Sequence, residues 1–481
     1  MNNDDPAASG LFEEESTGER EPAPVVLLPL AVDVDTPIPA LRDIRAQMVK
    51  LDAKADAQPG GGGADGADDE DKTVVVLADP EGLAPQPAML SPAAFALASL
   101  FNGERSARQA AEELGAQVGQ PVSPQNVLEL QRKLDEALFL YSEHFGKTVR
   151  RMLRTYLDKS VRPAVHAGTA YPAAPEQLQH TVAGYFSAPD GPGAPWEERP
   201  AATAAALPGK APHKVAGDTV RALILPHIDL RVGGATYAHG YAELLRHCQA
   251  DLFVILGVAH QAEAGGSYYV SVKDFATPLG PVKTAHAIAR HLQAGADTEP
   301  VMAELAHRTE HSVEFQAVLL AATLARYKRD FEIVPVLCGP VETFLAQESA
   351  PMSAPPFKEF TTALREELDG SKRKWCVLCS VDWSHVGPEF GNSTMMTPRL
   401  LPPMERYDRN LLKLVGRLDL EGFYREIART QNSRHVDAVM SVLTMLRTCE
   451  GLLKHGRLLH YDQMLKEGSH SAVSYAAMAF E

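Results

Sequence analysis

The chain has 481 residues, of which 45% are hydrophobic and 22% are charged, and it carries a formal net charge of -16 at pH 7. This length exceeds what one hydrophobic core supports, so we expect two or three structural units. The negative charge argues against binding to nucleic acid or to anionic membranes, because both require a positive surface. Five cysteines are too few for a disulfide framework and agree with a reducing compartment.

The first 72 residues are rich in Asp, Glu, Ala, Pro and Gly, and they end in QPGGGGADGADDEDK. Such a segment cannot bury enough apolar surface to order itself, so we predict disorder over residues 1–72. Within it, PAPVVLLPLAVDV could add a strand to a neighbour, although a lightly structured tail is the preferred interpretation. The N-terminus lacks the features of a secretory signal, and no apolar run reaches the roughly 20 residues of a membrane helix, which predicts a cytoplasmic protein.

A small domain is predicted over residues 73–145, followed by a basic connector over residues 146–160. TVVVLADPEG is typical of a strand and a turn, and three amphipathic stretches each begin at a serine that fits a helix N-cap, Ser91 being the first. The stretches LFNGERSARQAAEEL and LDEALFLYSEHF resemble the winged-helix PqqD-like domains that hold peptides in peptide-modifying systems. A generic helical adaptor is the alternative interpretation.

The rest of the chain, residues 161–481, alternates between apolar strands and helices, with a surface loop inserted at about residues 188–214. Continuous apolar strands that alternate with helices predict an α/β unit, in which helices cover both faces of a mainly parallel sheet. The strand stretches are RALILPH, DLFVILGVAH, FEIVPVLCG and KWCVLCSVDWSH, and the helix stretches are ATYAHGYAELLRHC, KTAHAIARHLQ, EHSVEFQAVLLAATLARY and FKEFTTALREEL.

Three histidines follow buried strands of this unit: His227, His260 and His385. Because ligands of open α/β sheets bind at the carboxyl ends of the strands, these side chains are placed for function. Asp229 and Asp382 stand beside two of them. Imidazole and carboxylate groups together suit zinc, iron or copper, and two histidines with one further ligand are typical of non-haem Fe(II) sites.

The stretch AHRTEHSVEFQ places His307, His311 and Glu314 at helical positions i, i+4 and i+7. His311 and Glu314 could point together into the crevice, His311 as proton donor and Glu314 as its partner. An exposed polar helix face is the alternative.

Two other patterns have structural interpretations. Cys376 and Cys379 of CVLC lie three residues apart in a strand, project to opposite faces and so cannot share an ion. Gly233 and Gly234 fit turn residues, and the absence of GxGxxG and Walker sequences leaves a nucleotide site unsupported.

Eight ordered motifs from about Val161 to Glu481 resemble the Memo family, whose bacterial members are called AmmeMemoRadiSam system protein B. That family resembles class III extradiol dioxygenases in fold. The motifs are VRPAVHAGTAYPAAPEQL, LPHIDLRVGGATYAHGY, VILGVAH, ATPLGPVKT, EHSVEFQ, IVPVLCG, SVDWSHVG and HSAVSYAAMAF.

The resemblance implies that His227 and His260 bind the metal and that His311 is an acid or base. Animal members have a Cys ligand in a motif like SSDFCHWG, where this chain has Ser384. A hydroxyl is a poor ligand for such metals, so the third contact could instead come from Asp382, His385 or water. The family stretch CGRHPI corresponds to NSRHVDAV here, and we expect His435 near the pocket.

The resemblance implies a metal-dependent oxidoreductase like the extradiol dioxygenases, with Fe(II) as the first choice of metal and copper or zinc as alternatives. His385 and Asp229 are further catalytic candidates. The substrate of this oxidoreductase would be a small molecule or a peptide, and its partner would be a radical-SAM protein. The alternative is a non-catalytic metal-binding or adaptor protein that docks a peptide or protein partner; Ser384 favours this alternative somewhat.

Overall fold

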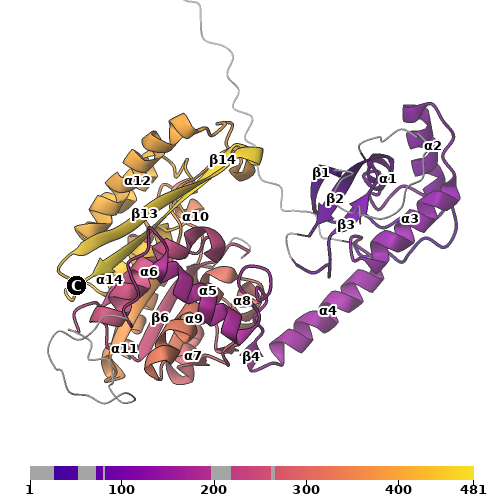
Figure 1. Cartoon of the computed structure of the whole chain (residues 1–481). Coiled ribbons are helices and arrows are strands. Elements are labelled where there is room, and N and C mark those ends of the chain that lie inside the picture. Colours follow the sequence, from indigo (N-terminus) through magenta and orange to yellow (C-terminus); the bar gives the residue numbers. More distant parts are fainter. Residues whose placement is uncertain (1–25, 52–71, 80–81, 197–217, 262–265) are drawn as a thin grey trace, which may run out of the picture. The chain divides into compact units, whose positions relative to one another are not determined.

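The computed structural model describes residues 26–51, 72–79, 82–196, 218–261 and 266–481. The chain divides into two units, Met1–Met152 and Leu153–Glu481, each of which can be followed in Figure 1. Predictions that fall on residues 1–25, 52–71 and 197–217, which include most of the predicted disordered segment and of the inserted loop, lie outside the described residues.

The first unit packs three helices beside a small antiparallel sheet with the strand order β1-β2-β3. Its helices begin at serine N-caps, and the Ser91 hydroxyl accepts a hydrogen bond from the Ala94 amide at 3.2 Å. The resemblance to PqqD-like domains stays a prediction. The elements are β1 (Arg45–Leu51), β2 (Lys72–Ala78), β3 (Ala88–Leu90), α1 (Pro92–Ala98), α2 (Ala107–Val118) and α3 (Pro124–Glu136), followed by α4 (Glu143–Leu157).

Residues 26–51 belong to this unit, so the prediction of disorder over residues 1–72 is wrong for them. Ala31 and Ile38 are buried in its core. The backbone of Ala31 exchanges two hydrogen bonds with the side chain of Gln131, which ties the segment to α3. Leu28 forms a parallel bridge with Ser142. The described part of PAPVVLLPLAVDV, residues 26–34, therefore packs against this unit through an isolated bridge without forming a strand.

The second unit is built on a large mixed sheet, which confirms the predicted α/β class. The path through this sheet is β12-β14-β5-β11-β6-β10-β7, and the central strands β5, β11, β6 and β10 are parallel. The strands of the unit are β4 (Val161–Arg162), β5 (Ala222–Leu225), β6 (Leu252–Val258), β7 (Tyr268–Val270), β8 (Asp274–Phe275), β9 (Lys283–Thr284), β10 (Glu332–Cys338), β11 (Trp375–Ser380), β12 (His385–Val386), β13 (Gly456–Lys466) and β14 (Ser471–Phe480).

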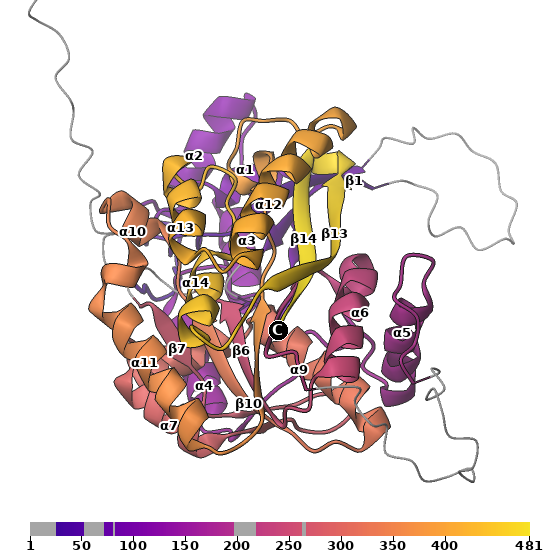
Figure 2. The ribbon, with the colours of Figure 1, turned by 90° about the vertical axis from the view of Figure 1, so that its left-hand side faces the viewer.

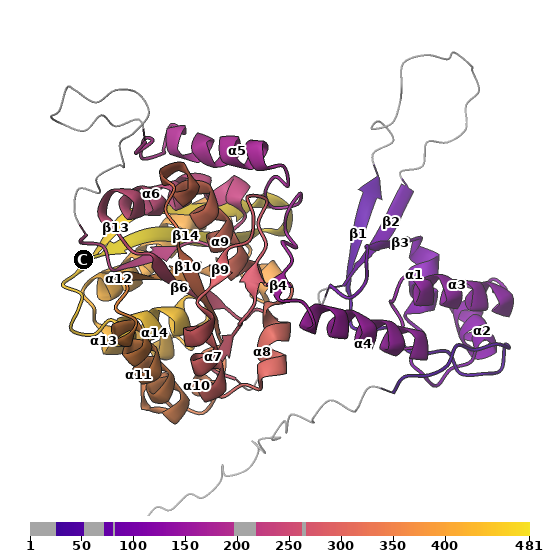
Figure 3. The ribbon, with the colours of Figure 1, turned by 90° about the horizontal axis from the view of Figure 1, so that it is seen from below.

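Helices cover both faces of this sheet, as Figures 2 and 3 show. Leu223 and Leu225 pack into the core under α5, α6 and α9, whereas Ala222 and Ile224 pack into the core under α7, α11 and α14. The helices are α5 (Pro175–Ser187), α6 (Leu230–His247), α7 (His286–Gly295), α8 (Pro300–His307), α9 (His311–Leu324), α10 (Glu342–Ala346), α11 (Pro355–Gly370), α12 (Leu401–Gly416), α13 (Leu420–Arg429) and α14 (Val439–Thr448).

The two-residue alternation of side chains also separates Cys376 and Cys379, which lie in opposite cores as predicted. The interpretation of Gly233 and Gly234 as turn residues is wrong, because α6 begins at Leu230 and includes both. A Cβ atom at Gly234 would lie 2.3 Å from the ring of Tyr185, so close helix packing explains this glycine. None of the described helices is long and apolar enough to cross a membrane.

Candidate metal centre

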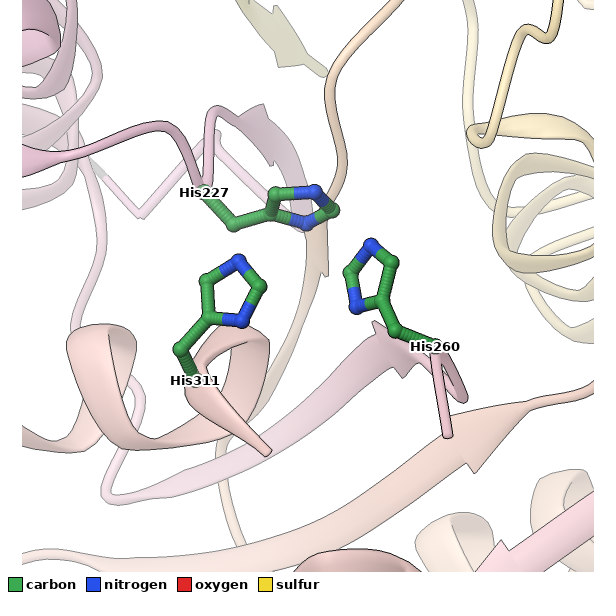
Figure 4. A group of neighbouring side chains, drawn as sticks. All are labelled: His227, His260 and His311. Atoms are coloured by element: carbon green, nitrogen blue, oxygen red, sulfur yellow. The ribbon is translucent and has the colours of Figure 1, made fainter. Parts of the chain in front are cut away.

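Three histidines meet at the carboxyl ends of the central strands. His227 follows β5 and His260 follows β6, while His311 is the first residue of α9. One ring nitrogen from each of the three lies within 4.8 Å of the others, and the ring centroids are 4.8 to 5.0 Å apart. Figure 4 shows the rings converging from their separate segments. This spacing allows a single ion to contact all three rings.

Hydrogen bonds fix which nitrogen of each ring faces the centre. The Nδ1 atom of His227 lies 2.9 Å from the carbonyl oxygen of Ser380; because a carbonyl only accepts, Nδ1 donates to it and Nε2 is the nitrogen that faces the centre. The Nδ1 atom of His260 lies 3.1 Å from both oxygens of Glu310, and that of His311 lies 3.2 Å from one of them. A buried partner at Nδ1 is the usual support of a histidine that binds metal through Nε2.

Asp437 adds a carboxylate that no sequence pattern marks as part of the site. Its Oδ1 atom accepts a hydrogen bond from the Asp382 amide at 2.9 Å. Its Oδ2 atom is buried without a hydrogen bond of good geometry from any described residue, although it lies 3.0 Å from Nε2 of His227 and 3.8 Å from Nε2 of His260. The carboxylate oxygen of Asp437 therefore lies beside two of the three imidazoles, and imidazole and carboxylate groups together suit zinc, iron or copper.

Burial and neighbouring charges shift the ionisation of the group. Burial alone would lower the pKa of His227, but the carboxylates of Asp437 and Asp382 raise it to about 9. At His311 burial prevails over the attraction of Glu310 and lowers the pKa to about 4. Burial would raise the pKa of Glu310, yet the neighbouring His260 and His311 hold it well below its usual range. The centre thus pairs buried carboxylates with one imidazole whose pKa is raised and another whose pKa is lowered.

Asp382 and His385, both candidates from the sequence, flank this group. Oδ1 of Asp382 accepts hydrogen bonds from the amides of His227 and Ile228 at 3.0 and 3.3 Å, which holds the segment after β5. Nδ1 of His385 lies 3.0 Å from the carbonyl oxygen of His435 and carries a proton for the same reason as in His227. Nε2 of His385 lies 3.8 Å from Oδ2 of Asp437.

We call His227, His260, His311 and Asp437 the metal group. The structure places Ser384 outside it. Its side chain is fully buried, and its hydroxyl donates a hydrogen bond to Oδ1 of Asp408. The hydroxyls of Ser474 and Tyr461 donate to Oδ2 of the same carboxylate at 2.6 and 2.7 Å. Ser384 is therefore a structural partner of Asp408, to which its hydroxyl donates.

The predicted helix face of His307, His311 and Glu314 does not form, because α8 ends at His307 and α9 begins at His311. His307 is fully buried, and its Nε2 atom lies 3.0 Å from the Tyr269 carbonyl oxygen. Glu314 is also fully buried and forms an ion pair with Arg162, so it does not reach the crevice. Of the three residues, only His311 joins the metal group.

A cavity of about 840 Å³ opens beside the metal group. His435 lines it, as predicted, and so does Asp229, which also forms the N-cap of α6 and an ion pair with Arg231. Its lining also includes apolar side chains, among them Phe390 and Met464. The cavity can therefore hold a molecule with an apolar body and a polar end beside the histidines.

Comparison with known proteins gives consistent matches. A family model described as Memo-like protein matches residues 162–479. A MEMO1 family protein of Aquifex aeolicus is 27% identical over 406 residues, which cover 84% of this chain and 95% of that protein. Protein MEMO1 of Rattus norvegicus is 24% identical over 326 residues, which cover 66% of this chain and 96% of that protein.

The match with the Aquifex aeolicus protein is longer than the span of residues 162–481, so it includes part of the first unit. Among solved structures, the uncharacterized protein JW3007 of Escherichia coli K12 has a TM-score of 0.32 and 13% identity, over 55% of this chain and all of that chain. A likeness this low supports no conclusion about function.

Proposed function

The chain belongs to the Memo-like protein family, and from this premise we propose that it is a metal-binding protein whose centre is formed by His227, His260, His311 and Asp437. The observation that carries the proposal is the buried Oδ2 atom of Asp437, which lies among imidazole nitrogens without a good hydrogen bond from the described residues. A buried carboxylate oxygen left in this way is destabilising, and a cation at this point would satisfy it.

We propose further that the centre serves a non-haem oxidoreductase similar to the extradiol dioxygenases. Two histidines and one carboxylate are typical of non-haem Fe(II) oxygenases, and His227, His260 and Asp437 supply that set. Fe(II), when bound, supplies one-electron chemistry with O2. Copper and zinc are the alternatives.

The residues of the chain have distinct roles in this proposal. Nε2 of His385 accepts a proton from the substrate, since its Nδ1 atom is occupied by carbonyl oxygens and Nε2 faces the group. Phe390 and Met464 contact the apolar part of the substrate and exclude water. The substrate is a small molecule or a peptide, and a radical-SAM protein is the proposed partner.

A purely metal-binding role is the second candidate, and one observation favours it. A ring nitrogen of His311 lies within 4.8 Å of one in His227 and one in His260, so that with Asp437 the protein offers four donor groups. Four protein ligands are typical of closed structural sites, whereas catalytic sites keep a position open. In this case the first unit would dock a peptide or protein partner, and the metal would stabilise the second unit.

The test combines metal analysis with an oxygen assay. Purified protein, reconstituted in parallel with Fe(II), Cu(II) or Zn(II), is analysed for bound metal, and O2 consumption is followed with catechol-like compounds and peptides. The oxidoreductase is supported if the wild type binds one equivalent of metal and consumes O2, and if His385→Gln consumes no O2. Metal without turnover supports the binding role. Failure to retain any of the three metals overturns both.

A further inference from the structure

Glu310 occupies an unusual place for a glutamate. It is the N-cap of α9, where its Oε1 atom accepts hydrogen bonds from the amides of His311 and Ser312 at 2.8 and 2.9 Å. Ser, Thr, Asp and Asn are the residues preferred at this position, because their short side chains reach back to the helix amides. Glu310 is also almost completely buried, with 2% exposure, although its carboxylate is charged. Capping alone does not account for a buried glutamate here.

The same carboxylate reaches a second segment of the chain. The amide of His260 donates to Oε2 of Glu310 at 3.2 Å, and Nδ1 of His260 lies 3.1 Å from each oxygen. Nδ1 of His311 lies 3.2 Å from Oε1. One side chain therefore joins the end of β6 to the start of α9 and holds the Nδ1 side of two rings of the metal group. A carboxylate at Nδ1 fixes the ring orientation and makes the other nitrogen a stronger ligand.

Arg162 fixes the backbone that carries Glu310. Its guanidinium is fully buried and donates to the carbonyl oxygens of Glu310 at 2.6 Å and of His307 at 2.5 Å. It also forms an ion pair with Glu314, whose other oxygen accepts a hydrogen bond from the Tyr171 hydroxyl. The planar fork of arginine thus spans the turn between α8 and α9, which a lysine cannot do.

We propose that Glu310 is the positioning residue of the metal centre, and that Arg162 acts through it. Glu310 holds the rings of His260 and His311 so that both present Nε2 to one ion, and Arg162 keeps the turn in the conformation that makes this possible. Neither residue contacts the ion. The inference rests on the proposed metal-binding function and adds to it the group that sets the affinity and geometry of the site.

The test uses Co(II) as the probe with the full-length protein, because its visible absorption reports ligand geometry as well as occupancy. Glu310→Gln keeps the size of the side chain and removes its charge. We expect this variant to bind Co(II) about 10- to 100-fold more weakly than the wild type, with an altered absorption spectrum. Arg162→Lys keeps the charge beside Glu314 but loses the fork, and we expect a smaller loss in the same direction.

Glu304→Gln is the matched control. Glu304 is a buried carboxylate of the same unit that accepts hydrogen bonds from the Ser271 hydroxyl and the Val272 amide, both at 2.8 Å. It lies outside the metal group, so this variant can lose stability but should bind Co(II) with the affinity and spectrum of the wild type. Circular dichroism of every variant identifies any that do not fold.

Two outcomes separate this inference from the proposed function. If the wild type binds Co(II) and Glu310→Gln binds it with the same affinity and spectrum, the role of Glu310 is overturned while the metal site stands. If the wild type binds no Co(II), the proposed function fails and the inference fails with it. If Glu310→Gln does not fold, the Co(II) affinity of Arg162→Lys is the deciding measurement. Unchanged Co(II) binding by Arg162→Lys then overturns the proposal.

Discussion

The Oδ2 atom of Asp437 lies 3.0 Å from the Nε2 atom of His227, at the point where the end of β5 meets the turn before α14. The two residues are far apart in the sequence, and the backbone amide of Asp382 holds the other carboxylate oxygen in place. This relationship turns a group of histidines into a mixed donor set of the kind that binds iron or zinc.

Replacement of Asp437 by Asn should therefore weaken metal binding. The amide keeps the shape of the side chain but removes the negative charge that attracts the cation. We expect a loss of affinity at least as large as the about 10- to 100-fold caused by loss of a supporting group, measured by titration with Zn(II). Asp229→Asn, which changes a carboxylate in the same cavity, is the control and should bind as the wild type does. Equal affinities for all three proteins would remove Asp437 from the site.

Replacement of His311 by Ala should reduce metal content. The sequence suggested that His311 handles protons, in which case its loss would abolish activity and leave the metal bound. In the structure its ring nitrogen lies within 4.8 Å of a ring nitrogen of His227 and of His260. Elemental analysis distinguishes the two roles, with His385→Ala as the comparison, which we expect to retain the metal. Full metal content in the His311 variant would restore the proton-transfer role.

Replacement of Ser384 by Ala should lower stability and leave metal binding unchanged. The hydroxyl of Ser384 is one of three that donate to the buried Asp408, and burial raises the pKa of this carboxyl. Loss of one donor to a buried acceptor costs about 1 to 3 kcal/mol. Urea denaturation measures the change, and elemental analysis the metal. A variant with normal stability but no metal would show that Ser384 is a ligand after all.

His307 should make the protein less stable in mild acid. Burial lowers the pKa of His307 to about 4, whereas the unfolded chain titrates near the ordinary value of 6.5. Between these values the unfolded state binds the extra proton, so the free energy of unfolding falls as the pH falls through this window, by about 3 kcal/mol in total. The contribution is fully present above pH 6.5.

The comparison variant is His307→Gln, whose amide can still donate to the Tyr269 carbonyl but does not titrate. Urea denaturation at pH 7, 6 and 5 should give a smaller loss of stability for this variant than for the wild type. The difference between the two proteins isolates His307 from the other titrating histidines. Parallel pH profiles would mean that His307 is not the residue responsible.

The sequence by itself determined the sheet and the place of the site. Apolar strands that alternate with helices can bury their side chains only between helical layers, and parallel strands bring their carboxyl ends to one edge. His227 and His260 were therefore predictable, because each directly follows such a strand. The serine N-caps were equally local, since each depends only on its own first helical turn.

Only the tertiary structure decided the remaining members of the site. Asp437 lies in an irregular turn, and Glu310 stands at a helix start where a shorter residue is usual, so no periodicity marks either one. Ser384, a predicted ligand, instead donates to Asp408. The physical reason is that a polar side chain takes its role from the partners that meet it across the fold, whereas an apolar pattern depends only on its own spacing along the chain.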